Sequence, residues 1–431
     1  MKARLQALSL SALLLSGSAL TGCATFGQNH STPPEEPEQL TQYEADPILI
    51  RATRHGDDFE TESLDSEEVF QRAFQDFQAR RYEDALENYL IIITYFPDSR
   101  YHLPALYNGG LCLEHLEEWR NAIVLYERLL EEFPDSSEAL NAQFRIANAL
   151  YELEDFRAVE ELLTSVLLRS DLTHFDRIEA HVRRGFALLE LEDWTDAQNS
   201  FDNALESNRR APNRERLGED NRFILQAHYG LGLSYHHRMN QIPLVLPPSR
   251  MTEDLNLKAD YHQRAQRSYI MALRQHHPYW SVAAGYQIGR LYEDFYLHIF
   301  TAEIPDDLTE RELQVYFEEL RKKIRPLMDR AISVYERNLS LSRRVITRPE
   351  TEEWIQATAL HMSRMRAFLD DPLVQRRAEE LVISGASLQD LWDPTFYLNH
   401  HIQEALRSAR QALPAPEPPP APATTDDDPQ S

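Results

Sequence analysis

Three tandem histidine pairs are the residues of this chain whose type could bind a metal ion: His236–His237, His276–His277 and His400–His401. Imidazole nitrogens are common ligands of zinc and nickel, so two pairs that converge in the fold could form a metal site. Neighbouring residues on a helix do not share a face, which makes a single pair a poor site. Histidines on helix surfaces or at helix ends are the favoured alternative. We therefore expect no metal site and no cofactor.

The carboxylates and the sequence motifs of the chain give no indication of catalysis. The chain has no glycine-rich phosphate loop, no Gly-x-Ser-x-Gly elbow and no His-Glu-x-x-His sequence. Acidic residues such as Glu114, Glu117 and Glu118 are spaced as on the solvated face of a helix. We expect no catalytic residues, and hence no enzymatic activity.

Cys23 has neighbours that indicate covalent chemistry on its thiol. Lys2 and Arg4 precede an apolar stretch from Leu5 to Leu15, and small residues follow, as in a secretory signal peptide. The stretch is shorter than the ~20 residues that span a bilayer. It ends in Leu20-Thr21-Gly22-Cys23, which resembles the lipobox of bacterial lipoproteins. The resemblance implies cleavage before Cys23 and acylation of its thiol, and two or more acyl chains anchor stably.

The residue after this cysteine bears on where the lipoprotein would be sorted. Ala24 stands where enterobacterial lipoproteins that stay in the inner membrane carry Asp. The resemblance therefore implies a lipid-anchored, periplasm-facing protein of the bacterial outer membrane. The alternative is a plain signal peptide with a chance cysteine. The second cysteine, Cys112, lies in an apolar stretch and is expected to be a small buried residue.

The central part of the chain repeats at intervals of 37 to 38 residues, as aligned columns show. An aromatic column contains Tyr82, Trp119, Phe156 and Trp194. Nine positions earlier stands a column of small residues, Ala73, Gly110, Ala147 and Gly185, continued by Gly232 and Gly289. Seven positions after the aromatic stands a column of Tyr89, Tyr126, Leu163 and Phe201, continued by Tyr269 and Tyr335. Between the columns, apolar residues recur at helical spacing.

These columns resemble the tetratricopeptide repeat (TPR), a pair of antiparallel helices A and B. The resemblance implies that helices A and B cross closely at the small residues, beside the large apolar ones. It predicts an all-α fold: a TPR α-solenoid of about six helix hairpins, the last two with insertions, plus a C-terminal helical cap. Thr309 followed by Glu312 indicates a capping box that opens a long helix B, with a kink expected at Pro326.

The predicted organisation has five parts. Residues 1–22 form the signal peptide, and 23–64 a lipidated, polar, flexible linker. Residues 65–345 form the solenoid, and 346–413 the helical cap, with helices over 354–369, 373–384 and 392–413. Residues 414–431 contain seven prolines and three consecutive aspartates, and are expected to be a disordered acidic tail.

The register also predicts a partner-binding surface. In TPR units, the helix A position three residues before the small column faces a concave groove. Aromatic residues fill this position in most repeats, and inward positions nearby add others. The predicted groove residues are Phe70, Tyr107, Phe144, Tyr151, Arg183, Phe186, Tyr229 and Tyr286. A peptide or helix segment of a partner could bind there. The alternative is that these rings only pack on neighbouring helices.

Charge and resemblance narrow the class of partner. The chain has 44 basic and 70 acidic residues, a net charge of −26, so nucleic acid is not an expected partner. Lysine is scarce in the groove register, so the two-carboxylate clamp of chaperone-binding TPR proteins is not matched. The lipobox and repeats together resemble bacterial envelope TPR lipoproteins, including outer-membrane assembly, cell-division coordinator and deltaproteobacterial gliding types. That resemblance implies a non-enzymatic scaffold for envelope or motility complexes, without a small-molecule substrate. The alternative is an accessory subunit of a peptidoglycan-active enzyme complex, docked through residues 350–413.

Overall fold

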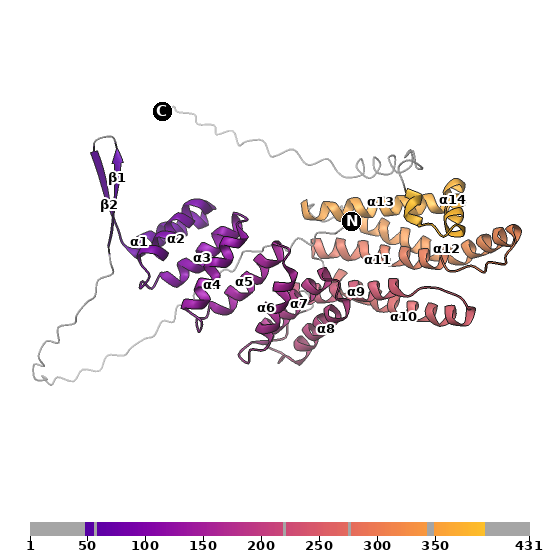
Figure 1. Ribbon diagram of the computed structural model, residues 1–431, viewed down its shortest axis with the longest axis horizontal. Helices are drawn as coiled ribbons and strands as arrows, with labels where there is room; N and C mark the ends of the chain where they lie inside the picture. Colours follow the sequence, from indigo (N-terminus) through magenta and orange to yellow (C-terminus); the bar gives the residue numbers. More distant parts are fainter. Residues whose placement is uncertain (1–47, 56–57, 219–220, 275–276, 343–348, 393–431) are drawn as a thin grey trace, which may run out of the picture. The chain divides into compact units, whose positions relative to one another are not determined.

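The computed structural model describes residues 48–55, 58–218, 221–274, 277–342 and 349–392 (Figure 1). The predicted signal peptide, Cys23 and the acidic tail lie outside these residues. The chain divides into two compact units, residues 1–162 and 163–431, and each is considered by itself.

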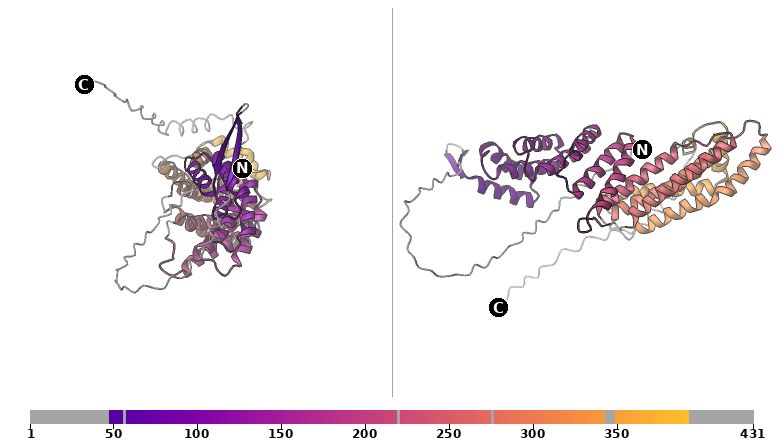
Figure 2. Two further views of the ribbon diagram at one scale, coloured as in Figure 1. Left: turned by 90° about the vertical axis from the view of Figure 1, so that its left-hand side faces the viewer. Right: turned by 90° about the horizontal axis from the view of Figure 1, so that it is seen from below.

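Unit 1 begins with two strands and continues as consecutive antiparallel helices (Figures 1 and 2). Its elements are β1 (Leu49–His55), β2 (Asp58–Leu64), α1 (Ser66–Gln78), α2 (Tyr82–Tyr95), α3 (His102–His115), α4 (Trp119–Glu132), α5 (Ala139–Glu152) and most of α6 (Phe156–Leu167). Each of the helices α1 to α4 contacts the next one along the chain. Unit 1 is therefore built from helix hairpins in sequence order.

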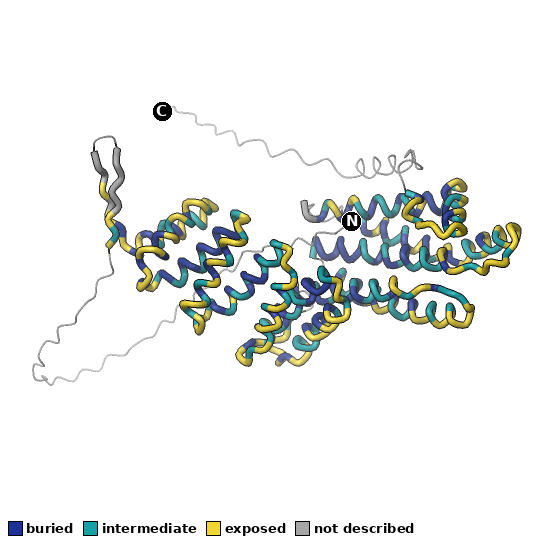
Figure 3. Tube along the Cα trace, in the orientation of Figure 1, coloured by how far each residue is buried: buried dark blue, intermediate teal, exposed yellow. Residues whose placement is uncertain are grey.

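Unit 2 continues with longer helices. They are α7 (His174–Glu190), α8 (Trp194–Arg210), α9 (Arg222–Gln241), α10 (Pro248–Leu273), α11 (Pro278–Phe300), α12 (Glu310–Ser342), α13 (Pro349–Asp370) and α14 (Pro372–Ile383), followed by the 3₁₀ helix η1 (Leu388–Trp392). Helix α11 contacts α9, α10, α12 and α13. It has no exposed residue, which Figure 3 shows as an unbroken run of buried and intermediate colour. Helix α11 is thus the centre of this unit.

The predicted all-α TPR fold is confirmed, and the two sequence columns meet as the repeat requires. A Cβ atom added to Gly110 would lie 2.5 Å from Cε1 of Tyr126, and one on Gly185 would lie 2.6 Å from Cε1 of Phe201. Gly232 and Gly289 meet Tyr269 and Tyr335 in the same way. Helix A and helix B approach so closely at these points that any side chain would displace the ring.

Each A–B turn of the first four repeats carries a residue in the left-handed conformation. Arg80, Glu117, Glu154 and Glu192 all have φ of 60°. At Glu154, the amide of the next residue donates to the carbonyl of Leu150 at 2.9 Å, and its own amide donates to Tyr151 at 3.0 Å. This is the Schellman motif that ends helices, in which glycine is the usual residue. A charged residue in that conformation costs ~1–2 kcal/mol.

The predicted flexible linker is wrong over residues 49–64. Strands β1 and β2 pair antiparallel without a bulge, from Leu49 opposite Leu64 to His55 opposite Asp58. Leu64 is buried in the hydrophobic core of unit 1, and Leu49 packs against the same core. The polar composition of this segment suggested a tether, but these two leucines attach one end of the strand pair to that core.

The insertions of unit 2 have defined structure. The segment after α9 lies against the end of α11, because the amide of Glu303 donates to Leu244 O at 2.9 Å and its carboxylate accepts from the amide of Leu246 at 2.6 Å. The predicted capping box before α12 is confirmed: the Thr309 amide donates to Glu312 at 2.8 Å. Pro326 lies inside α12.

Helices α13 and α14 match the first two helices expected in the C-terminal region. The third, expected over 392–413, lies outside the described residues apart from its first residue. Among the residues that the structure describes, no helix combines the length and the apolar character that crossing a membrane requires.

Candidate functional site

The predicted groove residues divide by burial. Phe144, Phe186 and Tyr229 are 6%, 8% and 1% exposed, so their rings belong to the core. Tyr229 packs against Tyr269 and Trp280, with ring centres 5.9 and 5.2 Å apart. For these three positions the packing interpretation fits the structure. The other five residues, Phe70, Tyr107, Tyr151, Arg183 and Tyr286, are partly exposed.

Three of the partly exposed rings lie on successive A helices of unit 1. Phe70 on α1 stacks on Tyr101, with centres 4.8 Å apart. Tyr107 on α3 packs on Tyr126 at 5.9 Å, and Tyr151 on α5 meets Phe156 edge-on at 5.1 Å. Each ring therefore packs on a neighbour while part of its surface stays accessible.

The remaining two lie in unit 2. Arg183 on α7 forms an ion pair with Glu179, one turn earlier, at 2.7 Å. Tyr286 on α11 packs against Trp354 and His361 of α13, at 5.4 and 5.6 Å. The structure brings Tyr286 to a polar cluster that the groove prediction did not include.

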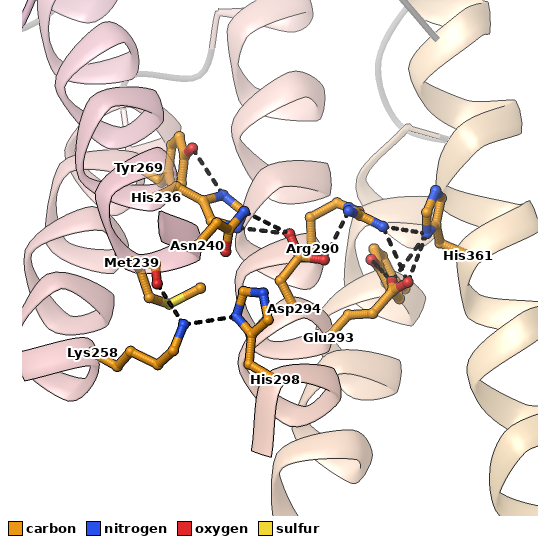
Figure 4. Close-up of polar contacts among 11 residues, drawn as sticks. His236, Met239, Asn240, Lys258, Tyr269, Arg290, Glu293, Asp294, His298 and His361 are labelled. Carbon is orange, nitrogen blue, oxygen red and sulfur yellow. Dashed lines mark hydrogen bonds and ion pairs between the residues drawn. The ribbon is translucent and has the colours of Figure 1, made fainter. Parts of the chain in front are cut away.

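That cluster is centred on α11, where Arg290 lies one turn before the adjacent residues Glu293 and Asp294 (Figure 4). Arg290 donates to Glu293 at 3.1 Å and to Asp294 at 2.8 Å. All three side chains are largely buried, and each carboxylate is only 4% or 11% exposed. Charges at such depth are tolerated when they are paired and fully hydrogen-bonded.

The two carboxylates bond to helices on opposite sides of α11 (Figure 4). Asp294 accepts from His236 Nε2 of α9, 3.0 Å away. Glu293 accepts from the hydroxyl of Tyr335 of α12 at 2.6 Å, and both its oxygens lie 3.0 Å from His361 Nδ1 of α13. The cluster therefore links four helices of unit 2.

The charges in the cluster stabilise one another. Burial alone would raise the pKa of Asp294, but Arg290 and His236 hold it well below the ordinary range. Burial would lower the pKa of Arg290, but Asp294 and Glu293 raise it instead. The ionised Arg290–Asp294 pair is thus the stable form, and Asp294 is not suited to act as a proton donor near neutral pH.

Lys258 of α10 lies beside this cluster and is fully buried. Its ammonium donates to Met239 O at 2.6 Å and lies 3.0 Å from His298 Nδ1 (Figure 4). Burial lowers the pKa of Lys258 to about 8, and burial together with the nearby lysine lowers the pKa of His298 to about 4. A neutral His298 therefore accepts the hydrogen bond of a charged Lys258 at pH 7.

The two histidines at 236–237 have different partners, so they do not form a metal site together. His236 bonds to Asp294, whereas His237 stacks on Trp194, with ring centres 3.9 Å apart. His277 caps the start of α11 by accepting from the amide of Trp280. His276, His400 and His401 lie outside the described residues. Within the described ranges, no group of three or more histidine, cysteine or acidic residues is placed to hold a metal ion.

A smaller cluster occupies the same register in unit 1. Glu114 of α3 accepts from the hydroxyl of Tyr126 at 2.7 Å and from Arg145 of α5 at 3.1 Å. The prediction that Glu114 lies on a solvated helix face is wrong, because the residue is 7% exposed. The buried hydroxyl and the guanidinium on the next A helix explain why a carboxylate is held there.

The register could have revealed these polar residues. Four positions after the small column, the repeats carry Phe77, Glu114, Tyr151, Leu189, His236 and Glu293. Glu114, His236 and Glu293 each lie within hydrogen-bond reach of the hydroxyl of Tyr126, Tyr269 or Tyr335. Where helix B carries Leu163 or Phe201 instead, the position holds Tyr151 or Leu189. The buried polar residue therefore accompanies the ring hydroxyl, except in repeat one.

These contacts decide what the arrangement can do chemically. Arg290, Glu293 and Asp294 have their bonding positions occupied by one another and by adjoining helices. A reaction centre needs a group that is free to meet a substrate. The cluster instead holds four helices in fixed register.

Comparison with known proteins agrees with the repeat assignment. The family described as tetratricopeptide repeat matches residues 104–136, which include most of α3 and all of α4. No curated protein matches the chain. The match and the helix hairpins identify an all-α TPR fold, which supports protein–protein interaction.

Several solved structures are similar to this chain at low identity. MamA from Desulfovibrio magneticus RS-1 is 13% identical, with 49% of this chain and 94% of that chain covered and a TM-score of 0.35. A tetratricopeptide repeat protein from Parabacteroides merdae is 16% identical, with coverages of 68% and 98% and a TM-score of 0.35. The C-terminal part of a TPR protein from Cytophaga hutchinsonii is 10% identical, with coverages of 78% and 99% and a TM-score of 0.43.

Proposed function

We propose that this chain is a non-enzymatic scaffold of the bacterial cell envelope. It is anchored in the outer membrane by lipid on Cys23, faces the periplasm, and holds components of an envelope or motility complex together. The observation that supports binding is the set of partly exposed rings on successive A helices of unit 1, Phe70, Tyr107 and Tyr151. The self-contained polar cluster of unit 2 supports a structural protein rather than an enzyme.

The three rings are suited to bind a peptide or a helix of a partner protein. Each is held by an aromatic neighbour, so little side-chain freedom is lost when a partner covers it. Tyrosine adds a hydroxyl to the apolar ring and is enriched at binding hot spots. Buried positions such as Tyr229 contribute to the framework and not to this surface.

The anchoring part of the proposal is supported by sequence. The order of a basic start, a short apolar stretch and Leu20-Thr21-Gly22-Cys23 fits a lipoprotein signal. A lipid anchor would also suit a chain whose described helices include none able to span a bilayer.

Site-specific photo-crosslinking tests the binding surface. A photoreactive phenylalanine analogue at Tyr107 should capture a partner in intact cells. The same analogue at Glu127, an exposed residue of α4 in the same repeat, is the matched control. Capture of the same proteins with equal yield at both positions would contradict the proposal.

Labelling and fractionation test the anchor. The wild-type chain should incorporate radioactive palmitate and sediment with outer membranes, whereas Cys23→Ser should do neither. Ala24→Asp should redirect the labelled protein to the inner membrane. An unlabelled wild-type chain would overturn the anchoring proposal and leave the binding surface to be judged on its own experiment.

A further inference from the structure

Arg364 of α13 differs from the other buried arginines of the array. Arg145 and Arg290 each pair with a buried carboxylate. Arg364 is only partly exposed, yet it has no hydrogen bond or ion pair within the part of the chain that the structure describes. Its Nε is buried and lacks an acceptor. A donor left in this state costs ~1–3 kcal/mol, more when it is charged.

The surroundings of Arg364 orient it without neutralising it. Its guanidinium carbon lies 5.3 Å from the ring centre of Trp392, within the range of a cation–π contact. Glu293 is the carboxylate that acts on it electrostatically. The oxygens of Glu293 are already bonded to Tyr335, Arg290 and His361. The guanidinium is held in place, and none of the described carboxylates pairs with it.

The electrostatics agree with the geometry. Burial lowers the pKa of Arg364, and nearby Arg290 lowers it further, against the opposing effect of Glu293. For Arg145 and Arg290 the balance is reversed, because their carboxylates raise the pKa. Arg364 is therefore a cation whose environment still favours an added negative charge.

We propose that Arg364 and Trp392 form a binding site for a carboxylate of an acidic peptide. The planar guanidinium can donate two parallel hydrogen bonds to a carboxylate, a geometry that lysine cannot provide. The indole of Trp392 orients the guanidinium plane. The inference is independent of the rings proposed to bind partners in unit 1.

Two sources could supply the carboxylate: a partner protein or this chain. The described structure ends at Trp392, within the site itself, and Asp426-Asp427-Asp428 follow 34 residues later. A random coil of that length would have a mean reach of about 30 Å, which corresponds to a millimolar effective concentration. The chain's own acidic end would therefore compete strongly with any partner.

Fluorescence anisotropy with a labelled synthetic peptide of residues 414–431 tests the site. The receptor is the mature chain with or without those residues. The shortened chain should bind the peptide, and Arg364→Met should weaken binding at least ~10-fold, the effect of one charge-assisted hydrogen bond. Arg366→Met is the matched control, because Arg366 is exposed and pairs with Glu336 on α12. It should bind like the wild type.

Two further arms identify the source. If the chain's own end fills the site, the intact chain should bind the added peptide at least ~10-fold more weakly than the shortened chain. A peptide in which all three aspartates are changed to asparagine should then bind the shortened chain poorly. If a hexaglutamate peptide binds the shortened chain through Arg364 but the 414–431 peptide does not, the site serves a partner. Binding of neither peptide, or equal binding by Arg364→Met with unchanged circular dichroism and melting temperature, would overturn the site.

Discussion

The clusters around Glu114 in unit 1 and Glu293 in unit 2 have the same arrangement, but the second contains more residues. Each glutamate stands four residues after a glycine, and each accepts from the tyrosine whose ring packs on that glycine. Each also meets a basic side chain from a following helix, Arg145 or His361. In unit 2, α11 adds Arg290 and Asp294 and so reaches α9 as well.

The difference follows from how many helices each central helix contacts. Helix α3 packs mainly on α2 and α4, and one carboxylate with two partners is sufficient. Helix α11 contacts α9, α10, α12 and α13, so its buried polar side chains meet partners on several helices. The helix with four neighbours therefore carries a connected network, whereas α3 carries a local one.

The largest expected effect comes from removing the centre of the larger network. Glu293→Ala leaves Arg290 buried without one of its carboxylates and removes the acceptor of Tyr335. We expect a loss of about 3–5 kcal/mol in the free energy of unfolding, measured by urea denaturation, with faster hydrogen exchange in α13. Glu336→Ala is the control, because its pair with Arg366 is exposed and should cost less than about 1 kcal/mol.

A smaller loss is expected in unit 1. Glu114→Ala should destabilise by about 2–3 kcal/mol, because Glu114 has two hydrogen-bonded partners, Tyr126 and Arg145, where Glu293 has three. Adding Arg145→Met should restore most of that loss, since the unpaired charge is removed with its partner. A double variant as unstable as the sum of the single variants would contradict this account.

The two units should also differ in how much stability they lose in acid. Burial lowers the pKa of His262 to about 4, and that of His298 to a similar value, below the unfolded value of about 6.5. The unfolded chain therefore binds protons first, and unit 2 should lose stability as the pH falls from 6.5 to 4, by up to ~1.4 kcal/mol per pH unit for His262. Hydrogen exchange in α10 and α11 at several pH values measures this. His262→Leu should flatten the dependence, and an unchanged slope would rule His262 out.

The smallest effect concerns the A–B turns of the first four repeats. Glu154→Gly should stabilise unit 1 by about 0.5–1 kcal/mol, because glycine removes the left-handed strain but loses more entropy on folding. The increase would appear as a higher urea midpoint with an unchanged slope. Glu161→Gly in the middle of α6 is the control, and it should destabilise by about 1 kcal/mol.

Sequence could predict the parts of this fold that repeat. Gly110 and Tyr126 recur at fixed spacing, and their contact follows from that spacing. Residues that occur once could not be placed: Lys258 lies on a helix lengthened by an insertion, so no other repeat shows where it points. The strands at 49–64 escaped prediction because their sequence has little apolar periodicity, although Leu49 and Leu64 at one end pack in the core.

The candidate site was predictable to a similar degree. Two buried residues, Phe144 and Tyr229, share the register of Phe70 and Tyr107, and periodicity alone does not show which rings a neighbouring helix covers. Glu114 was misplaced because its hydrophilic sequence neighbours resemble a solvated face. Its partner Arg145 is 31 residues away, and only the repeat register relates the two positions.

Two repeats carry an arginine two positions before the small column. This affects what happens when recombination removes one repeat from the gene. Arg183 precedes Gly185 as Arg145 precedes Ala147. A gene lacking the codons for 139–176 would therefore encode a chain in which Arg183 meets Glu114, and the buried carboxylate would keep a counterion. No equivalent exchange is open to repeat five, where Gly230 stands in place of the arginine.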